Sequence, residues 1–482
     1  MEEPVKTESR RGSHYPWLLF GAVFIVSMVY AAIANIQTYY GDCFFYWQFG
    51  DGIFENGLNF LNYPETYKGY FLPFIVSLFK TFLPGFWSWR FLASLSAAIC
   101  FSFSLPCLFT GKLIRSRRKF IRSLLAYLCF MWFWGDFMQY PLSDFAALFF
   151  MVTGSACLIY ARNTKKAAAV LLYLVSGACF YASYNTRAVY LYASVFALLI
   201  YIYSERKKII RLLPKFLLVF IGASVIALPQ CSINKKYVDR FSPEVYTEAY
   251  ANYSQNLETL QVYWGLGIPM FAGYFGDSEV YPQGGVFYLD KSGEEITKRE
   301  GITSENFKLT SLVKLFLKYP LDMTALYIRH LVALMTPSYR QAYITDLHRE
   351  ISFTVVLGIA IWITAGLALA AQIKKHISET GWWAFAVCLP ALFQLFGATE
   401  LRFFLPVYLL CYYYLFAFVD YGEFRAAYRG RWFQVIILSV FLALLWITVF
   451  ADLLADNREQ VFLIGNGTLF DSIRSFPSKI FR

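Results

Sequence analysis

The sequence predicts an all-α protein that crosses a membrane many times. Of its 482 residues, 58% are hydrophobic, 20% are aromatic and only 16% are charged, and the mean hydropathy is +0.46. A soluble protein of this length needs more polar residues to cover its surface, so the composition excludes the soluble classes. The formal charge of +11 does not indicate a nucleic-acid partner, because the excess of Lys and Arg lies in short clusters between apolar segments, where it orients membrane proteins.

The first apolar segment, residues 15–36, follows Lys6, Arg10 and Arg11 and carries no small-residue cleavage site. It is therefore predicted to be a retained membrane span that places the N-terminus in the cytoplasm. A polar, aromatic outer loop follows from residue 37 to residue 70.

Two apolar segments come next, residues 71–84 and 86–110. The first is short and contains Lys80. If both crossed, the basic run from Lys112 to Arg122 would lie outside, against the usual distribution of positive charge. We therefore predict that residues 71–84 form a re-entrant or interfacial helix and that only residues 86–110 cross.

This choice leaves about eleven spans in total and makes every cytoplasmic turn basic, whereas the short outer turns carry almost no Lys or Arg except Arg187 and Arg402. The nine further spans are residues 123–140, 144–161, 167–185, 187–203, 212–230, 351–372, 381–397, 403–420 and 432–452.

The chain is predicted to divide into four parts. Residues 1–230 form an N-terminal transmembrane module whose first outer loop covers residues 37–85, and residues 351–452 form the C-terminal spans. Between them, residues 231–350 form a long outer loop, in which the amphipathic segments 307–317 and 323–335 are predicted to lie in the membrane surface. Residues 453–482 form a polar outer tail.

Ionisable side chains near lipid are costly, so their positions are informative. Six of them, at the ends of spans, map to the outer boundary of the membrane, which predicts one acidic and basic cavity facing outward. They are Asp42, Asp136, Asp144, Arg187, Glu400 and Arg402.

All of these residues except Glu400 also have a plain structural explanation. Arg187 and Arg402 could extend to the interface without binding anything. Asp144 follows Pro141 and could be a helix N-cap, and Gly135-Asp136 is a turn dipeptide. Asp42 also follows a glycine, but it precedes Tyr46 and Trp47, which could form an aromatic wall for a sugar.

No metal or cofactor is expected. The four histidines are dispersed and form no metal-binding pattern, and a divalent-cation site made of Asp42 and Asp144 has no further support. The chain contains no Walker loop, GxGxxG or GxSxG motif, which argues against ATP-driven transport, dinucleotide chemistry and hydrolase chemistry.

Several motifs occur in a recognisable order: GDCFFYW at residues 41–47, ENG at 55–57, YP at 63–64, GYFLP at 69–73, YPLSD at 140–144, YNTR at 184–187 and ELRF at 400–403 with Pro406. In this order they resemble the GT-C fold glycosyltransferases, which include the protein O-mannosyltransferases and the aminoarabinose transferase of lipid A. The resemblance covers most of the chain and implies a polyprenyl-phosphate sugar donor, membrane-lipid contacts and a place in the plasma (inner) membrane with the active site on its outer face.

The resemblance also implies roles for individual residues. Asp42 matches the catalytic base, Asp144 matches a second acidic residue with Asp136 as its rival, and Arg187 and Arg402 match residues that contact the donor phosphate. The chain lacks the paired Asp-Glu of many members, which leaves Asp51 and Glu55 as rivals to Asp42. Its outer loop is small for a peptide-recognition domain, so a glycan or lipid acceptor is favoured over a protein.

The chemistry suits these residues independently. Transfer from a lipid-phosphate sugar requires a base for the acceptor hydroxyl and cations for the departing phosphate, and direct attack would invert the anomeric carbon. Neighbouring aromatic rings should raise the pKa of the Asp42 carboxyl and strengthen it as a base.

Two alternatives are a lipid-linked glycan polymerase or ligase that uses a lipid diphosphate, and a transporter or flippase of lipid-linked sugars. A transporter predicts polar groups at mid-membrane, where these spans are nearly uncharged.

Overall fold

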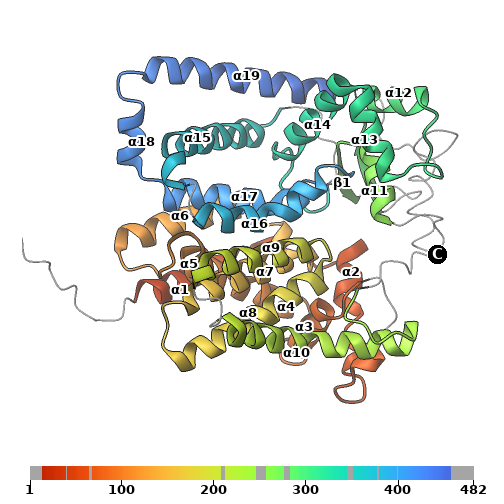
Figure 1. Cartoon of the computed structure of the whole chain (residues 1–482), viewed down its shortest axis with the longest axis vertical. Helices are drawn as coiled ribbons and strands as arrows, with labels where there is room; N and C mark the ends of the chain where they lie inside the picture. Colours follow the sequence, from red (N-terminus) through yellow and green to blue (C-terminus); the bar gives the residue numbers. More distant parts are fainter. Residues whose placement is uncertain are drawn as a thin grey trace, which may run out of the picture.

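The computed structural model describes residues 14–39, 41–63, 68–207, 212–245, 257–275, 283–344, 351–376, 379–398 and 400–456. Over these residues the chain is helical apart from one pair of strands. The long helices run side by side across Figure 1, and α11 to α14 and β1 gather at one end of them. The arrangement is consistent with an all-α polytopic membrane protein.

The N-terminal half consists of α1 (Tyr15–Ala34), α2 (Gly41–Gln48), η1 (Asp51–Ile53), η2 (Phe60–Asn62), α3 (Phe71–Lys80), α4 (Trp87–Ile99), the π-helical turn η3 (Cys100–Ser104), α5 (Leu105–Thr110), α6 (Arg117–Trp134), η4 (Phe137–Gln139), α7 (Ser143–Ala161), α8 (Lys166–Thr186), α9 (Tyr190–Glu205) and α10 (Leu212–Val238).

The C-terminal half consists of α11 (Leu257–Gly265), β1 (Met270–Phe275), β2 (Gln283–Tyr288), α12 (Lys291–Arg299), α13 (Leu309–Lys318), α14 (Pro320–Leu334), α15 (Phe353–His376), α16 (Glu379–Gln394), η6 (Leu401–Phe404), α17 (Leu405–Tyr413), the π-helical turn η7 (Tyr414–Phe418), α18 (Tyr421–Ala427) and α19 (Trp432–Asp456).

Each of the eleven predicted spans coincides with a helix or with consecutive helices. Within the described residues, eight helical segments are long and apolar enough to cross a membrane. The other three are α6, whose first turns contain Arg117, Arg118, Lys119 and Arg122, and α9 and α16, which have 16 residues each. The number of crossings therefore stays a prediction.

Residues 71–84, which we predicted not to cross, contain the ten-residue helix α3. Such a helix is about 15 Å long, half the thickness of the hydrocarbon core. The two predicted amphipathic segments are the helices α13 and α14. On α13, Leu309, Val313 and Leu317 are exposed and Leu315 is buried, which is the pattern of a surface helix. Their position relative to a membrane stays a prediction.

Two features of the outer segments differ from the prediction. The long outer loop contains the antiparallel pair β1 and β2, in register from Met270 opposite Tyr288 to Phe275 opposite Gln283. Both strands are short and contain glycine, so the sequence signal for them was weak. At the other end of the chain, α19 continues to Asp456, so the first residues of the predicted polar tail are helical. The remainder of the tail, 457–482, lies outside the described residues.

Helices α8 and α10 cross at very short range through two glycines. A Cβ atom on Gly177 would lie 1.8 Å from the carbonyl oxygen of Val219, and one on Gly222 would lie 1.9 Å from that of Leu174. Small residues at a crossing allow two backbones to pack closely in lipid. This contact fixes the two helices whose far ends support the candidate active site.

Gly177→Ala should destabilise the protein, because the added methyl group would push α8 and α10 apart at a cost of about 1–3 kcal/mol. We expect the melting temperature of the purified protein in detergent to fall by several degrees. Gly366→Ala in α15 is the matched control, because nothing lies within 4 Å of the position that its methyl group would take and alanine favours helix. Equal melting temperatures for the two variants would contradict this close crossing.

Candidate active site

Asp42 lies in the first turn of α2, and its closest charged partner is Lys68. The Lys68 Nζ lies 2.7 Å from Asp42 Oδ1 and donates a hydrogen bond to it. The lysine side chain is almost buried, with 9% of its surface exposed, whereas the carboxylate is 45% exposed. One face of the Asp42 carboxylate is therefore held by a buried cation while another remains open to an incoming group.

Arg402 connects three carboxylates. Its Nη2 lies 3.8 Å from Asp42 Oδ2, its Nη1 lies 3.6 Å from Asp144 Oδ2, and its Nε donates a hydrogen bond to Glu400. Arg187 donates a hydrogen bond from Nη1 to the other oxygen of Asp144. The structure thus brings together five of the six residues that we expected to share a cavity. Their roles stay predictions.

We define the ion-pair cluster as these five residues with Lys68. Its six members come from helix ends that meet at one end of the bundle: the starts of α2, α7 and η6, the end of α8, and the loop before α3. Each helix is apolar over most of its length, so the charges can only lie where the helix ends.

The plain structural explanations given for Asp144, Arg187 and Arg402 do not hold. Asp144 is not an N-cap, because the cap of α7 is Leu142 and Asp144 lies within the first turn. Arg187 and Arg402 do not extend to solvent, since their side chains are only 18% and 14% exposed and both point to carboxylates. The guanidinium of Arg187 also lies 4.1 Å from the centre of the Phe403 ring.

Lys68 belongs to the ion-pair cluster but was not predicted from the sequence. It is the only Lys or Arg in the first outer loop, residues 37–70, in a protein whose outer turns are poor in positive charge. That isolation was the available signal. A single cation in a polar loop nevertheless has no periodicity or motif that would assign it a partner.

The chain around Lys68 is fixed by polar groups on α8 and α10. Asn185 Oδ1 accepts a hydrogen bond of 2.9 Å from the Phe71 N–H, and Asn185 Nδ2 donates one of 2.8 Å to Gln230 Oε1. Gly69 lies directly against this group, because a Cβ atom there would be 1.8 Å from the Asn185 carbonyl oxygen. The loop can therefore approach α8 closely only with glycine at this position.

The two aromatic residues after Asp42 have different surroundings. Tyr46 is buried on the same side of α2 as Asp42, and the Lys68 Nζ lies 4.8 Å from the centre of its ring. Trp47 instead stacks on Phe86, with ring centres 5.3 Å apart, and lies 3.9 Å from the Lys80 Nζ. Tyr46 thus borders the ion-pair cluster, whereas Trp47 packs on the neighbouring side of the helix.

Three other acidic candidates lie outside the cluster. Asp136 accepts a 2.8 Å hydrogen bond from the Ala342 N–H and so fixes a turn of the outer segment. Asp51, a rival for the base, pairs with Lys80 at 2.9 Å. Glu55, the second rival, is exposed and its backbone forms a short bridge with Gly57.

The pKa of the Asp42 carboxyl moves in the opposite direction from our expectation. Burial alone would raise this pKa, but the charges of Lys68 and Arg402 lower it to about 2. The prediction that aromatic neighbours raise it is therefore wrong for the unliganded site, because a cation in contact outweighs the apolar rings. Asp42 is an ionised, cation-bound carboxylate at neutral pH.

Glu400 has the raised pKa instead. Burial is the main cause, and repulsion from the carboxylates of Asp144 and Asp42 adds to it, so that the pKa reaches about 7 despite the attraction of Arg402. A group that titrates near neutral pH can balance the charge of the cluster when another anion enters.

Residues of the predicted long outer loop pack against one side of the cluster. Phe271 of β1 forms a parallel backbone bridge with Glu400, and the Ala398 N–H donates a 3.0 Å hydrogen bond to the Gln261 carbonyl. The rings of Phe271 and Phe403 lie 6.2 Å apart. Residues far apart in the chain therefore enclose Glu400 and Arg402.

No group of three or more His, Cys, Asp or Glu residues is placed to hold a metal ion within the part of the chain that the structure describes. Arg402 lies in contact with both Asp42 and Asp144, so these carboxylates share a guanidinium.

Comparisons with protein-family models, curated proteins and solved structures found no match to this chain. The functional assignment therefore depends on the chemistry of the cluster.

The raised pKa of Glu400 predicts a pH-dependent stability. Between its ordinary value of 4.5 and about 7 the folded protein holds this proton more tightly than the unfolded chain, so the contribution is lost as pH rises through that window. Glu400→Gln should remove it, and the melting temperature of the wild type relative to this variant should fall between pH 4.5 and 7.

Glu300→Gln is the control, because the Glu300 carboxylate pairs with Lys318 and its pKa is lowered, so its own contribution to stability changes mainly below pH 4.5. This variant should keep the slope of the wild type. A Glu400→Gln protein that also keeps that slope would show that Glu400 does not titrate near pH 7.

Proposed function

We propose that this protein is a membrane glycosyltransferase of the GT-C type, which transfers a sugar from a polyprenyl-phosphate donor to a hydroxyl group of a glycan, lipid or protein acceptor. The observation that carries the proposal is Arg402 in contact with three carboxylates, beside Lys68 and Arg187, at the end of apolar helices. Buried charges are expensive in a membrane protein, and one cluster that combines acids with phosphate-binding cations matches this reaction.

The cations suit the leaving group. When the bond between the anomeric carbon and the phosphate oxygen breaks, its electron pair stays on the phosphate, which gains negative charge. Arg402 and Arg187 can bind phosphate oxygens in bidentate fashion and remain charged near lipid, and Lys68 adds a compact cation. Asp144 contacts both guanidinium groups and would act as a positioning residue for them.

Asp42 is the proposed base. It would take the proton from the acceptor hydroxyl while that oxygen attacks the anomeric carbon from the side opposite the phosphate, with inversion. A carboxylate with a pKa of about 2 is a weak base, but the phosphate of the donor would compete for Lys68 and Arg402. Donor binding would therefore free Asp42 from its cations and strengthen it as a base at the moment of use.

The charge pattern supports an orientation for this reaction. The turns at the end of the bundle away from the cluster are basic, which favours the cytoplasm for them and the outer face for the cluster. The proposed enzyme would act on the non-cytoplasmic side of the plasma (inner) membrane, where a lipid-linked donor presents its sugar.

Asp42→Asn should reduce sugar transfer at least about a hundredfold, because it removes the base but keeps the shape of the side chain. Purified protein would be assayed with labelled polyprenyl-phosphate sugars and, in parallel, with polyprenyl-diphosphate donors. Asp51→Asn is the matched control in the same loop and should retain activity, because Asp51 pairs with Lys80 outside the cluster. Equal activities would remove Asp42 as the base, and use of the diphosphate donors alone would contradict the proposed donor.

Lys68→Met should raise the KM for the donor roughly tenfold to a hundredfold, the usual loss for a hydrogen bond to a charged group. Lys80→Met removes the same charge from the neighbouring pair and should leave this KM unchanged. Steady-state kinetics with varied donor measures both. A KM that does not change in Lys68→Met would mean that this lysine does not bind the donor phosphate.

A further inference from the structure

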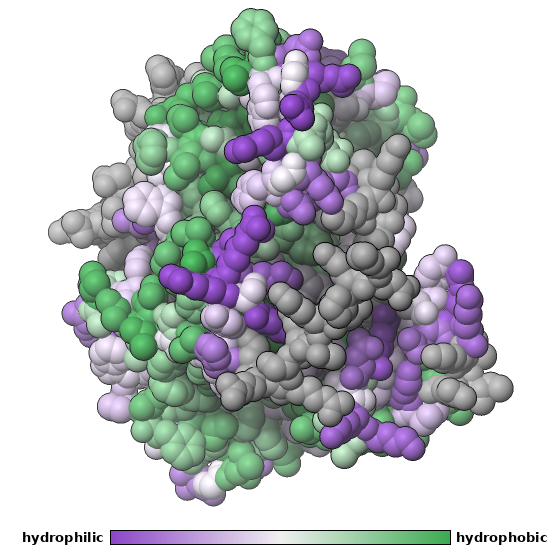
Figure 2. Space-filling view, turned by 90° about the vertical axis from the view of Figure 1, so that its left-hand side faces the viewer, coloured by the Kyte–Doolittle hydropathy of each residue, from purple (hydrophilic) through white to green (hydrophobic). Residues whose placement is uncertain are grey.

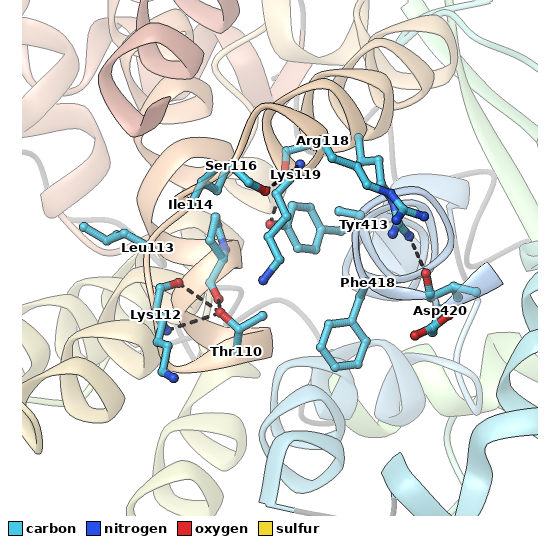
Figure 3. A pocket seen from close by; sticks show the side chains of 15 residues that line it. Thr110, Lys112, Leu113, Ile114, Ser116, Arg118, Lys119, Tyr413, Phe418 and Asp420 are labelled. Atoms are coloured by element: carbon cyan, nitrogen blue, oxygen red, sulfur yellow. Dashed lines mark hydrogen bonds between the residues drawn. The ribbon is translucent and has the colours of Figure 1, made fainter. Parts of the chain in front are cut away.

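A second polar site lies at the opposite end of the bundle from the ion-pair cluster. It is a cavity of about 300 Å³ between the turn that joins α5 to α6 and the end of η7. Figure 3 shows the side chains of Lys112, Arg118 and Lys119 around it, with Tyr413 and Phe418 of the adjacent helix. Arg122 completes its cationic lining.

The cavity is separate from the candidate active site. Helix α6 begins beside the cavity and ends near Asp136, and its 18 residues span about 27 Å. Arg402 and Phe418 lie near the two ends of the helical segment Leu401–Phe418, which separates them by about 24 Å along that segment. Figure 2 shows one end of the bundle, where hydrophilic residues lie between hydrophobic flanks. This is the distribution expected where the end of a membrane protein faces water and its flanks face lipid.

The lining carries four cations and one carboxylate. Lys112, Arg118 and Lys119 are exposed, and none of them forms an ion pair with a residue that the structure describes. Arg122 is half-buried and donates to the carbonyl oxygens of Phe416 and Val419. The positive charge of the cavity is therefore largely uncompensated.

The single carboxylate, Asp420, has a structural task. Its Oδ1 accepts hydrogen bonds of 2.9 Å from the Gly422 N–H and 3.2 Å from the Glu423 N–H, which caps α18. The Ser116 hydroxyl also lines the cavity; its oxygen accepts a hydrogen bond of 3.3 Å from the Lys119 N–H, and its O–H can donate to an anion.

The remaining walls are apolar, and they come from helices long enough to enter a membrane. Pro106, Tyr413 and Phe418 lie on these walls. Cations on one side and apolar rings on the other match the boundary between lipid headgroups and acyl chains, where Lys and Arg attract anionic headgroups. A soluble anion would gain nothing from the apolar side.

We propose that this cavity binds the phosphate group of an anionic lipid headgroup on the membrane face opposite the candidate active site. The phosphate would contact Lys119, Arg118 and Lys112, and the acyl chains would follow the apolar wall. If these cations served only to orient the protein in the membrane, the total number of cations in the turn would matter and their position in the cavity would not.

The test compares two double variants within the same basic run. Arg118→Gln with Lys119→Gln removes two cavity cations, and Arg115→Gln with Arg117→Gln removes two cations that do not line the cavity. Native mass spectrometry of the purified full chain in a non-ionic detergent would measure binding of dioleoyl phosphatidylglycerol, with dioleoyl phosphatidylcholine as the zwitterionic reference of zero net charge and inorganic phosphate as a competitor. The double variant Arg118→Lys with Lys119→Arg changes the same two positions but keeps both charges. It therefore separates the loss of charge from any effect of substitution at these positions on folding.

We expect phosphatidylglycerol to bind at least about tenfold more weakly to the cavity variant and within about twofold of wild type to the control and charge-conserving variants. Inorganic phosphate should not compete. Competition at millimolar phosphate would support the phosphate site but overturn the lipid as its ligand. Equal loss in both charge-removing variants, or no preference for phosphatidylglycerol over phosphatidylcholine, would overturn the proposal.

Discussion

The guanidinium of Arg402 is the interaction on which the rest of the site depends. Three carboxylates surround it, so removal of Arg402 would leave Asp42, Asp144 and Glu400 close together without the cation that they share. The cluster balances three acids against three cations, so it can be stable without a ligand. It can also respond to one, because a phosphate that enters must share or displace the existing carboxylates. The ion pairs that hold the cluster together are therefore the same ones that the proposed donor phosphate would change.

The fold supports this arrangement through contacts away from the charges. The short-range crossing of α8 and α10 brings Asn185 and Gln230 together, and these two side chains hold the loop that carries Lys68. Phe271 of β1 forms a backbone bridge with Glu400, which directly precedes η6. A loop of the N-terminal half and a strand of the C-terminal half therefore both contact the ion-pair cluster.

Much of this architecture could be predicted from the sequence, because apolar length and basic turns are strong signals in membrane proteins. The positions of the helices and the acids and arginines at their ends followed from these signals. Lys68 did not, since a single loop residue carries no period. The pKa of Asp42 was predicted in the wrong direction for the same reason: its sign depends on a partner 26 residues away. The β1–β2 pair depends on contacts that short, glycine-containing strands do not reveal.

The most direct test of the central claim is an electron cryo-microscopy structure of the protein with bound polyprenyl phosphate. The account predicts that the phosphate contacts Arg402 and Lys68 and that the hydrogen bond between Lys68 and Asp42 is broken or lengthened. Phosphate density at any other place, with the ion-pair cluster unchanged, would contradict it.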